Sequence, residues 1–171
     1  MDFFEVLEKR RSIRGFDSTR PVKDEDISRI LEAARMAPTA GNLQPFKIIV
    51  VKTEEGRKAL QSSTRQEALA QACVSLVFCV DSSRFQERYG ERGRGLYAIQ
   101  DSAIVCTYAH LTAAALGLAS SWIGAFDEMK VGKGLGLTDN LRPVAILPVG
   151  YPAKEPSPFE RRPMEELVIW K

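Results

Sequence analysis

From Ser102 to Phe126 the chain contains no aspartate, glutamate, lysine or arginine. A run of this length is sufficient to span a bilayer, but it includes His110, several serines and threonines, and two glycines near its end. Its first part, 103–116, is alanine-rich and predicts a helix, whereas 119–123 predicts a short strand. A helix that is apolar on every side is more often buried in a core or in an oligomer interface than in lipid. We therefore expect a buried helix here and no membrane segment.

The remaining pattern predicts alternating helices and buried strands in one domain, 1–171. Near-continuous apolar runs predict strands at 46–51, 75–80 and 144–149. Amphipathic or helix-favouring segments predict helices at 2–9, 24–37, 54–70 and 127–133. There is no internal repeat and no linker-like composition that would divide the chain.

Prolines and glycines set the expected boundaries. Pro38 is expected to end the second helix, and Gly132, Gly134 and Gly136 are expected to break the last one. Arg142 is expected to start a turn before the last strand. The arginine- and glycine-rich stretch 81–95 predicts a mobile surface loop, which is a candidate lid over a site. The tail from Ala153 contains several prolines, and its end, 165–171, predicts a strand or an arm that packs on another surface.

Composition limits the class of protein. With 44% apolar and 27% charged residues the chain is expected to be globular, and its net charge of +2 gives no general reason for nucleic-acid binding. Cys73, Cys79 and Cys106 show no C-x-x-C spacing, so neither a disulfide framework nor a zinc site is expected. This cysteine usage favours a reducing compartment and a cytoplasmic location. The N-terminal residues MDFFEVLEKR do not have the pattern of a signal peptide.

Few residue types capable of acid–base catalysis are present. The chain has one histidine, His110, which lies in the uncharged run and is expected to be a core or interface residue. A His-rich metal site is therefore excluded. The glycines at 90, 93 and 95 do not have the spacing of a dinucleotide fingerprint, and no G-x-S-x-G, P-loop or H-E-x-x-H motif occurs. An enzyme with these residues would need its chemistry from a cofactor.

A cluster of cations follows the first predicted helix, at Arg10-Arg11-Ser12-Ile13-Arg14. Cations at a helix C-terminus interact favourably with the helix dipole, so a solvated helix end explains the cluster. Guanidinium groups also bind phosphate in a bidentate manner, and a serine hydroxyl adds a further donor. The cluster by itself leaves the helix end and the anion site equally open.

A second polar segment, Pro38-Thr39-Ala40-Gly41-Asn42-Leu43-Gln44-Pro45, contains small and amide residues. Its simplest interpretation is a connection between a helix and a strand. Thr39, Asn42 and Gln44 bring neutral donors and acceptors close together without charge. This combination suits a polar heterocycle better than it suits a solvated loop.

These motifs, taken in order, resemble the nitroreductase family of FMN-dependent oxidoreductases. The resemblance rests on Arg-Arg-Ser-Ile-Arg, Ala-Pro-Thr-Ala-Gly-Asn-Leu-Gln-Pro-Phe, Ala-Leu-Gly-Leu-Ala-Ser-Ser-Trp-Ile-Gly and Val-Gly-Tyr-Pro, and it runs the whole length of the chain. It implies an α+β fold, with a mostly antiparallel central sheet flanked by helices. It also implies an intertwined homodimer that exchanges C-terminal arms and binds FMN at the dimer interface. The uncharged helix would then be buried against the partner.

The resemblance also implies which residues bind the cofactor. Arg10, Ser12 and Arg14 match positions that contact the FMN phosphate, ribityl chain and ring oxygens, and Arg11 belongs to the same segment. The other implied positions are the loop supplied by the second subunit (Pro38, Thr39, Ala40, Asn42, Gln44), a turn facing the flavin near N5 (Ile123, Gly124, Ala125) and a late phosphate-binding cation (Arg161, with Arg162). Whether Gln66, Gln100 or Asp101 also contacts the cofactor is left open. No metal is implied.

The implied activity is hydride transfer from NADH or NADPH, in ping-pong order, to an electron-poor acceptor such as a nitroaromatic or a quinone. Arg14 is a candidate to stabilise the reduced ring, because a positive charge near N1 and O2 favours the anionic form. Alternatives that keep the flavin are flavin fragmentation, dehalogenation, F420-linked chemistry and non-catalytic flavin binding. A basic module for phosphorylated or nucleic-acid ligands is a further alternative, but no aromatic residues interleave with the arginines.

Overall fold

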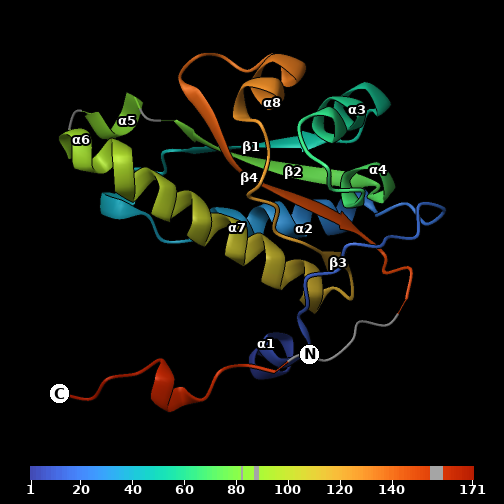
Figure 1. The fold of residues 1–171 in the computed structure, drawn as a ribbon, viewed down its shortest axis with the longest axis horizontal. Coiled ribbons are helices and arrows are strands. Elements are labelled where there is room, and N and C mark those ends of the chain that lie inside the picture. Colours follow the sequence, from blue (N-terminus) through green and yellow to red (C-terminus); the bar gives the residue numbers. More distant parts are fainter. Residues whose placement is uncertain (82, 87–88, 155–159) are drawn as a thin grey trace.

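An antiparallel sheet of four strands, in the order β1-β2-β4-β3, forms the centre of the computed structural model (Figure 1). The structure describes residues 1–81, 83–86, 89–154 and 160–171. The strands are β1 (Phe46–Val51), β2 (Val74–Asp81), β3 (Ala119–Ser120) and β4 (Leu141–Gly150). The α-helices are α1 (Phe3–Lys9), α2 (Asp24–Arg35), α3 (Glu54–Ser62), α4 (Ala68–Gln71), α5 (Ser83–Gln86), α6 (Gly90–Arg92), α7 (Ala98–Ala115) and α8 (Glu128–Leu135).

Helices cover both faces of the sheet. Residues that alternate along β2 point to opposite faces, so Leu76 and Phe78 pack with α2 and α7, whereas Val77 and Cys79 pack with α3, α4 and α8. The central strand β2 is therefore buried at almost every position, and β4 is buried throughout 145–150. The α+β fold and its antiparallel sheet are as the sequence predicted.

The helix expected at 103–116 is confirmed and begins earlier, at Ala98, after a π-helical turn, Gly93–Tyr97. It lies across one face of the sheet beside α2 (Figure 1). No helix among the described residues is both long and apolar enough to cross a membrane.

Several boundaries differ from the prediction. β1 is an edge strand with Lys47 and Val50 exposed, so its apolar run does not correspond to full burial. The single helix expected at 54–70 is two helices, α3 and α4. Ser63 caps the C-terminus of α3, and its hydroxyl donates to Leu60 O. Arg142 lies within β4, not in a turn.

The arginine- and glycine-rich stretch was expected to be an irregular loop. Its described part is instead largely helical, in α5, α6 and the π-helical turn. Leu43, Tyr89 and Tyr97 belong to a small apolar cluster, so this stretch packs against the 38–45 segment.

The helix expected at 127–133 contains two of the three glycines that were expected to break it. Gly132 and Gly134 lie inside α8, and only Gly136 ends the helix, in a left-handed conformation with φ of 63°. A Cβ on Gly134 would lie 2.7 Å from Ala59 Cβ, whereas a Cβ on Gly132 would meet no atom within 4 Å. The glycine at 134 therefore permits close approach of α3 and α8.

This difference predicts opposite effects of two alanine substitutions in one helix. Gly134→Ala is expected to lower the free energy of unfolding by about 1–3 kcal/mol, because α8 must move away from α3. Gly132→Ala is expected to leave stability unchanged or raise it by up to about 1 kcal/mol, because alanine restricts the unfolded chain. Urea unfolding of both variants tests this, and equal effects would contradict the proposed close approach.

The C-terminal segment extends past α1 and away from the sheet (Figure 1). It contains one short 3-10 turn, η3 (Met164–Glu166), and its apolar end is exposed, with Ile169 at 83% and Trp170 at 90%. Within a single chain this segment therefore does not form the strand that the sequence allowed.

Candidate functional site

The arginine segment is fixed to the edge of the sheet. Arg10 caps the C-terminus of α1, where its backbone N–H donates to Val6 O over 2.9 Å. Ile13 N donates to Ser120 O over 3.0 Å, and Ser12 forms a parallel bridge with Ser120. The chain between Arg10 and Ile13 therefore lies along β3 with its position set by backbone contacts.

A second cation reaches this segment from the other end of the chain. Burial and the nearby Arg161 and Arg11 guanidiniums lower the pKa of Arg10. No carboxylate of a described residue lies within 4.0 Å of the Arg10 guanidinium. Like charges repel, so the charges of Arg161 and Arg11 near Arg10 favour a bound anion. The charge of Arg161 thus acts on Arg10 from the other end of the chain, and a cofactor-binding role for the two residues stays a prediction.

A hollow of about 150 Å³ lies beside this cluster, between the arginine segment and the end of α7. Its lining residues are Lys9, Arg10, Arg11, Ile13, Ala114, Gly117, Leu118, Ala119, Ser120 and Pro152. Arg10 and Arg11 are half-buried, whereas the other predicted residues of this group are exposed: Ser12, Arg14, Arg161 and Arg162.

His110 of α7 contacts Arg10. Its side chain is buried, with Nε2 3.3 Å from Arg10 Nη1 and Nδ1 2.6 Å from Ser120 Oγ. The expectation that this residue lies in the core is confirmed. Its contact with Arg10 joins residues 100 positions apart, and no local pattern in the sequence signals it.

The amide-rich loop adopts an unusual backbone. Gly41, Asn42 and Gln44 have φ of 57°, 55° and 50°. Glycine and asparagine tolerate this left-handed region, but for glutamine it is strained. Gln44 N donates to Thr39 Oγ1 over 3.1 Å and Gln44 Nε2 donates to Asn42 Oδ1 over 2.9 Å, so the loop holds its own polar groups in place. Such strained residues cluster at functional sites.

Asp101 anchors this loop to α7. Its carboxylate is 4% exposed, and Ala40 N donates to both oxygens, at 3.1 and 3.0 Å. Burial raises the pKa of Asp101, and the bond from Ala40 opposes that change. Of the three residues that the sequence left open, Asp101 therefore supports the loop, Gln100 is exposed on α7 and Gln66 lies in the turn before α4.

Loss of the Asp101 carboxylate is expected to destabilise the chain. Asp101→Ala leaves Ala40 N–H without its acceptor, so the free energy of unfolding should fall by about 1–3 kcal/mol. Asp101→Asn keeps an acceptor oxygen and should lose less. The exposed neighbour, in Gln100→Ala, should change stability by no more than about 0.5 kcal/mol. Urea denaturation measures all three, and equal stability of the alanine and wild-type proteins would contradict the anchoring role.

The turn after β3 supplies backbone groups near the arginine segment. Ile123 is buried and exchanges hydrogen bonds with Ile146, with N···O distances of 2.9 and 3.0 Å. Thr64 Oγ1 donates to Ala125 O over 2.8 Å, while Gly124 and Ala125 are exposed. The strand bridge and the bond from Thr64 thus fix the turn, and the exposed Gly124 is the part whose backbone makes neither contact.

The two polar regions lie at opposite ends of α7 (Figure 1). Asp101 holds the amide loop near the start of the helix, and His110 contacts the arginine segment near its end. Asp101 and His110 are nine residues apart, which corresponds to about 14 Å along a helix. Within one chain the predicted site residues therefore form two separate groups.

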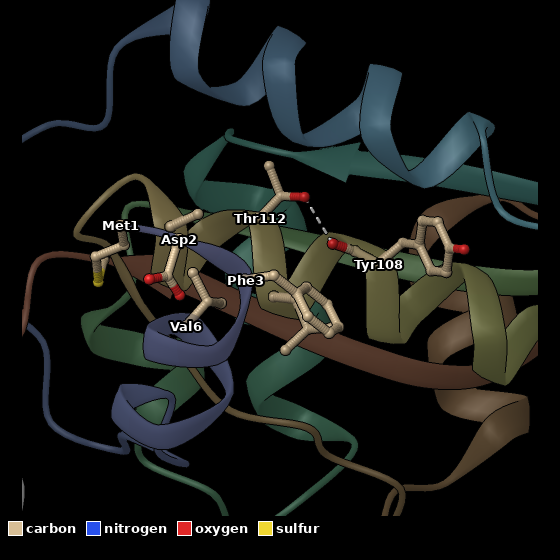
Figure 2. A pocket seen from close by; sticks show the side chains of 8 residues that line it. Met1, Asp2, Phe3, Val6, Tyr108 and Thr112 are labelled. Atoms are coloured by element: carbon tan, nitrogen blue, oxygen red, sulfur yellow. Dashed lines mark hydrogen bonds between the residues drawn. The ribbon is translucent and has the colours of Figure 1, made fainter.

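An apolar groove of about 450 Å³ lies between α1 and α7 (Figure 2). Its lining residues are Met1, Asp2, Phe3, Val6, Tyr108, Leu111, Thr112 and Ala115. Phe3 is 62% exposed, and Phe4 beside it is 73% exposed. Leu7 is also exposed, and Val6 is the one buried residue of α1, so the apolar side chains of this helix are largely uncovered.

Metal-binding residues do not gather in the part of the chain that the structure describes. No group of three or more His, Cys, Asp or Glu side chains there is arranged to hold a metal ion. Cys73, Cys79 and Cys106 are free thiols, and burial raises the pKa of Cys79 to about 12. Among the described residues, the polar groups of the candidate site are therefore cations, amides and backbone groups, not a cluster of metal ligands.

Comparison with known proteins identifies similar chains. The model of the nitroreductase family matches residues 7–72 and 61–151. An NADH dehydrogenase of Thermus thermophilus is 32% identical over 191 residues, covering 95% of this chain and 93% of its own length. The FMN reductase [NAD(P)H] of Bacillus subtilis is 30% identical over 173 residues, covering 93% of this chain and 69% of its own. A nitroreductase family protein from Clostridium difficile, solved by crystallography, superposes with a TM-score of 0.89 at 34% identity, covering 100% of this chain and 99% of that one.

Proposed function

The chain belongs to the nitroreductase family, and on that premise we propose that it is an FMN-dependent oxidoreductase. It takes hydride from NADH or NADPH and passes it to an electron-poor acceptor, such as a nitroaromatic or a quinone. Relatives named FMN reductase and NADH dehydrogenase support the cofactor and the donor. The cation cluster, the amide loop and the open turn after β3 support the assignment of FMN to this chain.

The observation that carries the proposal is the hollow of about 150 Å³ that Lys9, Arg10 and Arg11 line together. The charge of Arg161, from the other end of the chain, lowers the pKa of Arg10, and no carboxylate of a described residue forms an ion pair with Arg10. A dianionic phosphate accounts for this arrangement, because guanidinium groups bind it in a bidentate manner. Arg11, Ser12 and Arg162 complete the proposed phosphate side.

The amides suit the other end of FMN. The isoalloxazine ring has carbonyl oxygens and ring nitrogens at its edge, and neutral donors and acceptors match these groups. Pro38 and Thr39 begin the proposed ring-binding loop, which continues through Ala40, Asn42 and Gln44. On the opposite side, Ile123, Gly124 and Ala125 would bring backbone groups to the ring.

We propose that a second copy of the chain completes the site. The cation group and the amide loop lie at opposite ends of α7, so one chain does not bring them around a single ligand. In an isologous dimer, the cation group of one chain meets the amide loop of its partner. The uncovered face of α1, the groove beside it and the exposed Trp170 supply the apolar area for such an interface.

When bound, FMN supplies the two-electron chemistry, and the residues of this chain bind and orient it. The donor and the acceptor use the same exposed side of the ring in turn, which is a ping-pong order. Arg14 is proposed to stabilise negative charge on the reduced ring. The three free thiols are consistent with a reducing compartment, and we propose the cytoplasm.

The test is an absorption spectrum of the purified protein, taken before and after anaerobic addition of NADH or NADPH. Oxidised-flavin bands that bleach with either nucleotide support the proposal. Bands that persist point to the flavin-fragmenting, dehalogenating or F420-linked alternatives, or to non-catalytic flavin binding. Failure to bind added FMN would overturn the cofactor assignment.

A further inference from the structure

His110 of α7 is held between two groups of the cation site, Arg10 and Ser120. Its Nε2 lies 3.3 Å from Arg10 Nη1, and its Nδ1 lies 2.6 Å from Ser120 Oγ. The ring is 7% exposed, so water does not readily replace either partner. Ser120 is also the residue whose backbone fixes the arginine segment through Ile13.

The chemistry of these partners determines the protonation of the ring. A guanidinium has donors and no acceptor, so Arg10 donates and His110 Nε2 accepts. The proton of the neutral ring is therefore on Nδ1, which donates to Ser120 Oγ. An imidazolium has two donors and no acceptor, so protonation of His110 removes the bond to Arg10 and adds a like charge beside it.

Each element around His110 supports the neutral form. The segment after α1 presents Arg10, and β3 presents the neutral hydroxyl of Ser120. One turn earlier on α7 is Cys106, whose thiol stays protonated because burial raises its pKa. The residues that α2 and β4 pack against α7 in this core are apolar. Burial and the Arg10 charge together lower the pKa of His110 to about 4.

We infer that His110 is a positioning residue for the cofactor phosphate: its neutral ring holds the Arg10 guanidinium toward the anion site through Nε2. This inference rests on the proposed FMN function. It gives His110, which contacts Arg10 and Ser120, a part in binding the cofactor phosphate. It also makes phosphate binding dependent on the protonation of one buried ring.

Two isosteric substitutions separate the two ring nitrogens. In His110→Gln the side-chain oxygen can reach the place of Nε2 and accept from Arg10. In His110→Asn the shorter amide reaches only the place of Nδ1, near Ser120. If the Nε2 acceptor matters, His110→Asn should weaken FMN binding by about ten- to hundredfold, the range for a hydrogen bond to a charged group. His110→Gln should stay within about threefold of wild type.

Riboflavin, which lacks the phosphate, provides the control ligand. Fluorescence titration of apoprotein should show that His110→Asn weakens binding of FMN but not of riboflavin. In an Arg10→Ala background the same substitution should cause no further loss of FMN affinity. Equal weakening of FMN and riboflavin, or undiminished FMN binding by His110→Asn, would overturn the inference and leave the proposed function intact. Failure of the wild-type protein to bind FMN would overturn both.

The pH dependence gives an independent readout. The ratio of wild-type to His110→Gln affinity for FMN cancels the titration of the ligand phosphate, which both proteins share. The ratio should be constant from pH 8 to pH 6 and fall as the pH approaches the lowered pKa of His110, about 4. A ratio that does not change with pH, although both proteins remain folded, would contradict the requirement for a neutral ring.

Discussion

Two variants that each lose nearly all of their FMN during purification, because they bind it weakly, are expected to retain it when they share a dimer. The first is Arg10→Ala, which removes the buried cation of the phosphate side. The second is Asn42→Gly combined with Gln44→Gly, which removes the amides of the ring side. Glycine is chosen because φ is 55° and 50° at these positions, a region in which alanine would be strained.

The expected recovery follows from the separation of the two polar groups along α7. If each FMN lies between the cation group of one chain and the amide loop of its partner, a mixed dimer has one site with both groups intact and one with neither. Co-expression with two different tags and tandem purification isolates this mixed dimer. It should retain about one FMN per dimer, whereas each variant alone should retain almost none.

The same experiment distinguishes the opposite arrangement. If both groups of a site came from one chain, every site in the mixed dimer would carry a defect, and no FMN would be retained. A wild-type dimer assembled with the same two tags controls for losses during purification. The result therefore reports which chain supplies each half of the site, independently of the catalytic rate.

The sequence predicted best those features that depend on local pattern. The apolar runs of β2 and β4 correspond to strands buried on both faces, and the uncharged run corresponds to α7. It was less informative where tertiary packing decides. β1 is an apolar run like β2 but lies at the sheet edge, and Gly134 lies inside α8, where a side chain would meet Ala59 of α3.

The residues of the candidate site also divide into those that the local sequence marks and those that only tertiary contacts place. The composition of the arginine segment and of the amide loop marked them as polar sites, since each carries its signal in consecutive residues. The roles of Asp101 and His110 depend on contacts with residues 61 and 100 positions away. A single sequence contains no local signal for such contacts. The helix that was predicted as a buried core element thus also positions the two polar groups of the candidate site.

One glutamate on the exposed face of α1 is expected to separate the dimer. Phe3 lines the groove between α1 and α7, and its side chain is 62% exposed in the single chain (Figure 2). In the proposed dimer Phe3→Glu buries an unpaired carboxylate at the interface, which costs several kcal/mol. The dissociation constant of the dimer should therefore rise by at least about 100-fold.

The substitution should not disturb the fold of the single chain, because Phe3 is in the first turn of α1 and glutamate is favourable there. Met129→Glu is a matched control, since Met129 is 82% exposed in the first turn of α8, on the other face of the sheet. Sedimentation velocity should show a monomer for Phe3→Glu and a dimer for Met129→Glu. Because the proposed site takes its amide loop from the partner, the monomer should also lose FMN, whereas the control should keep it. A Phe3→Glu protein that remains dimeric with full FMN would place the interface elsewhere on the chain.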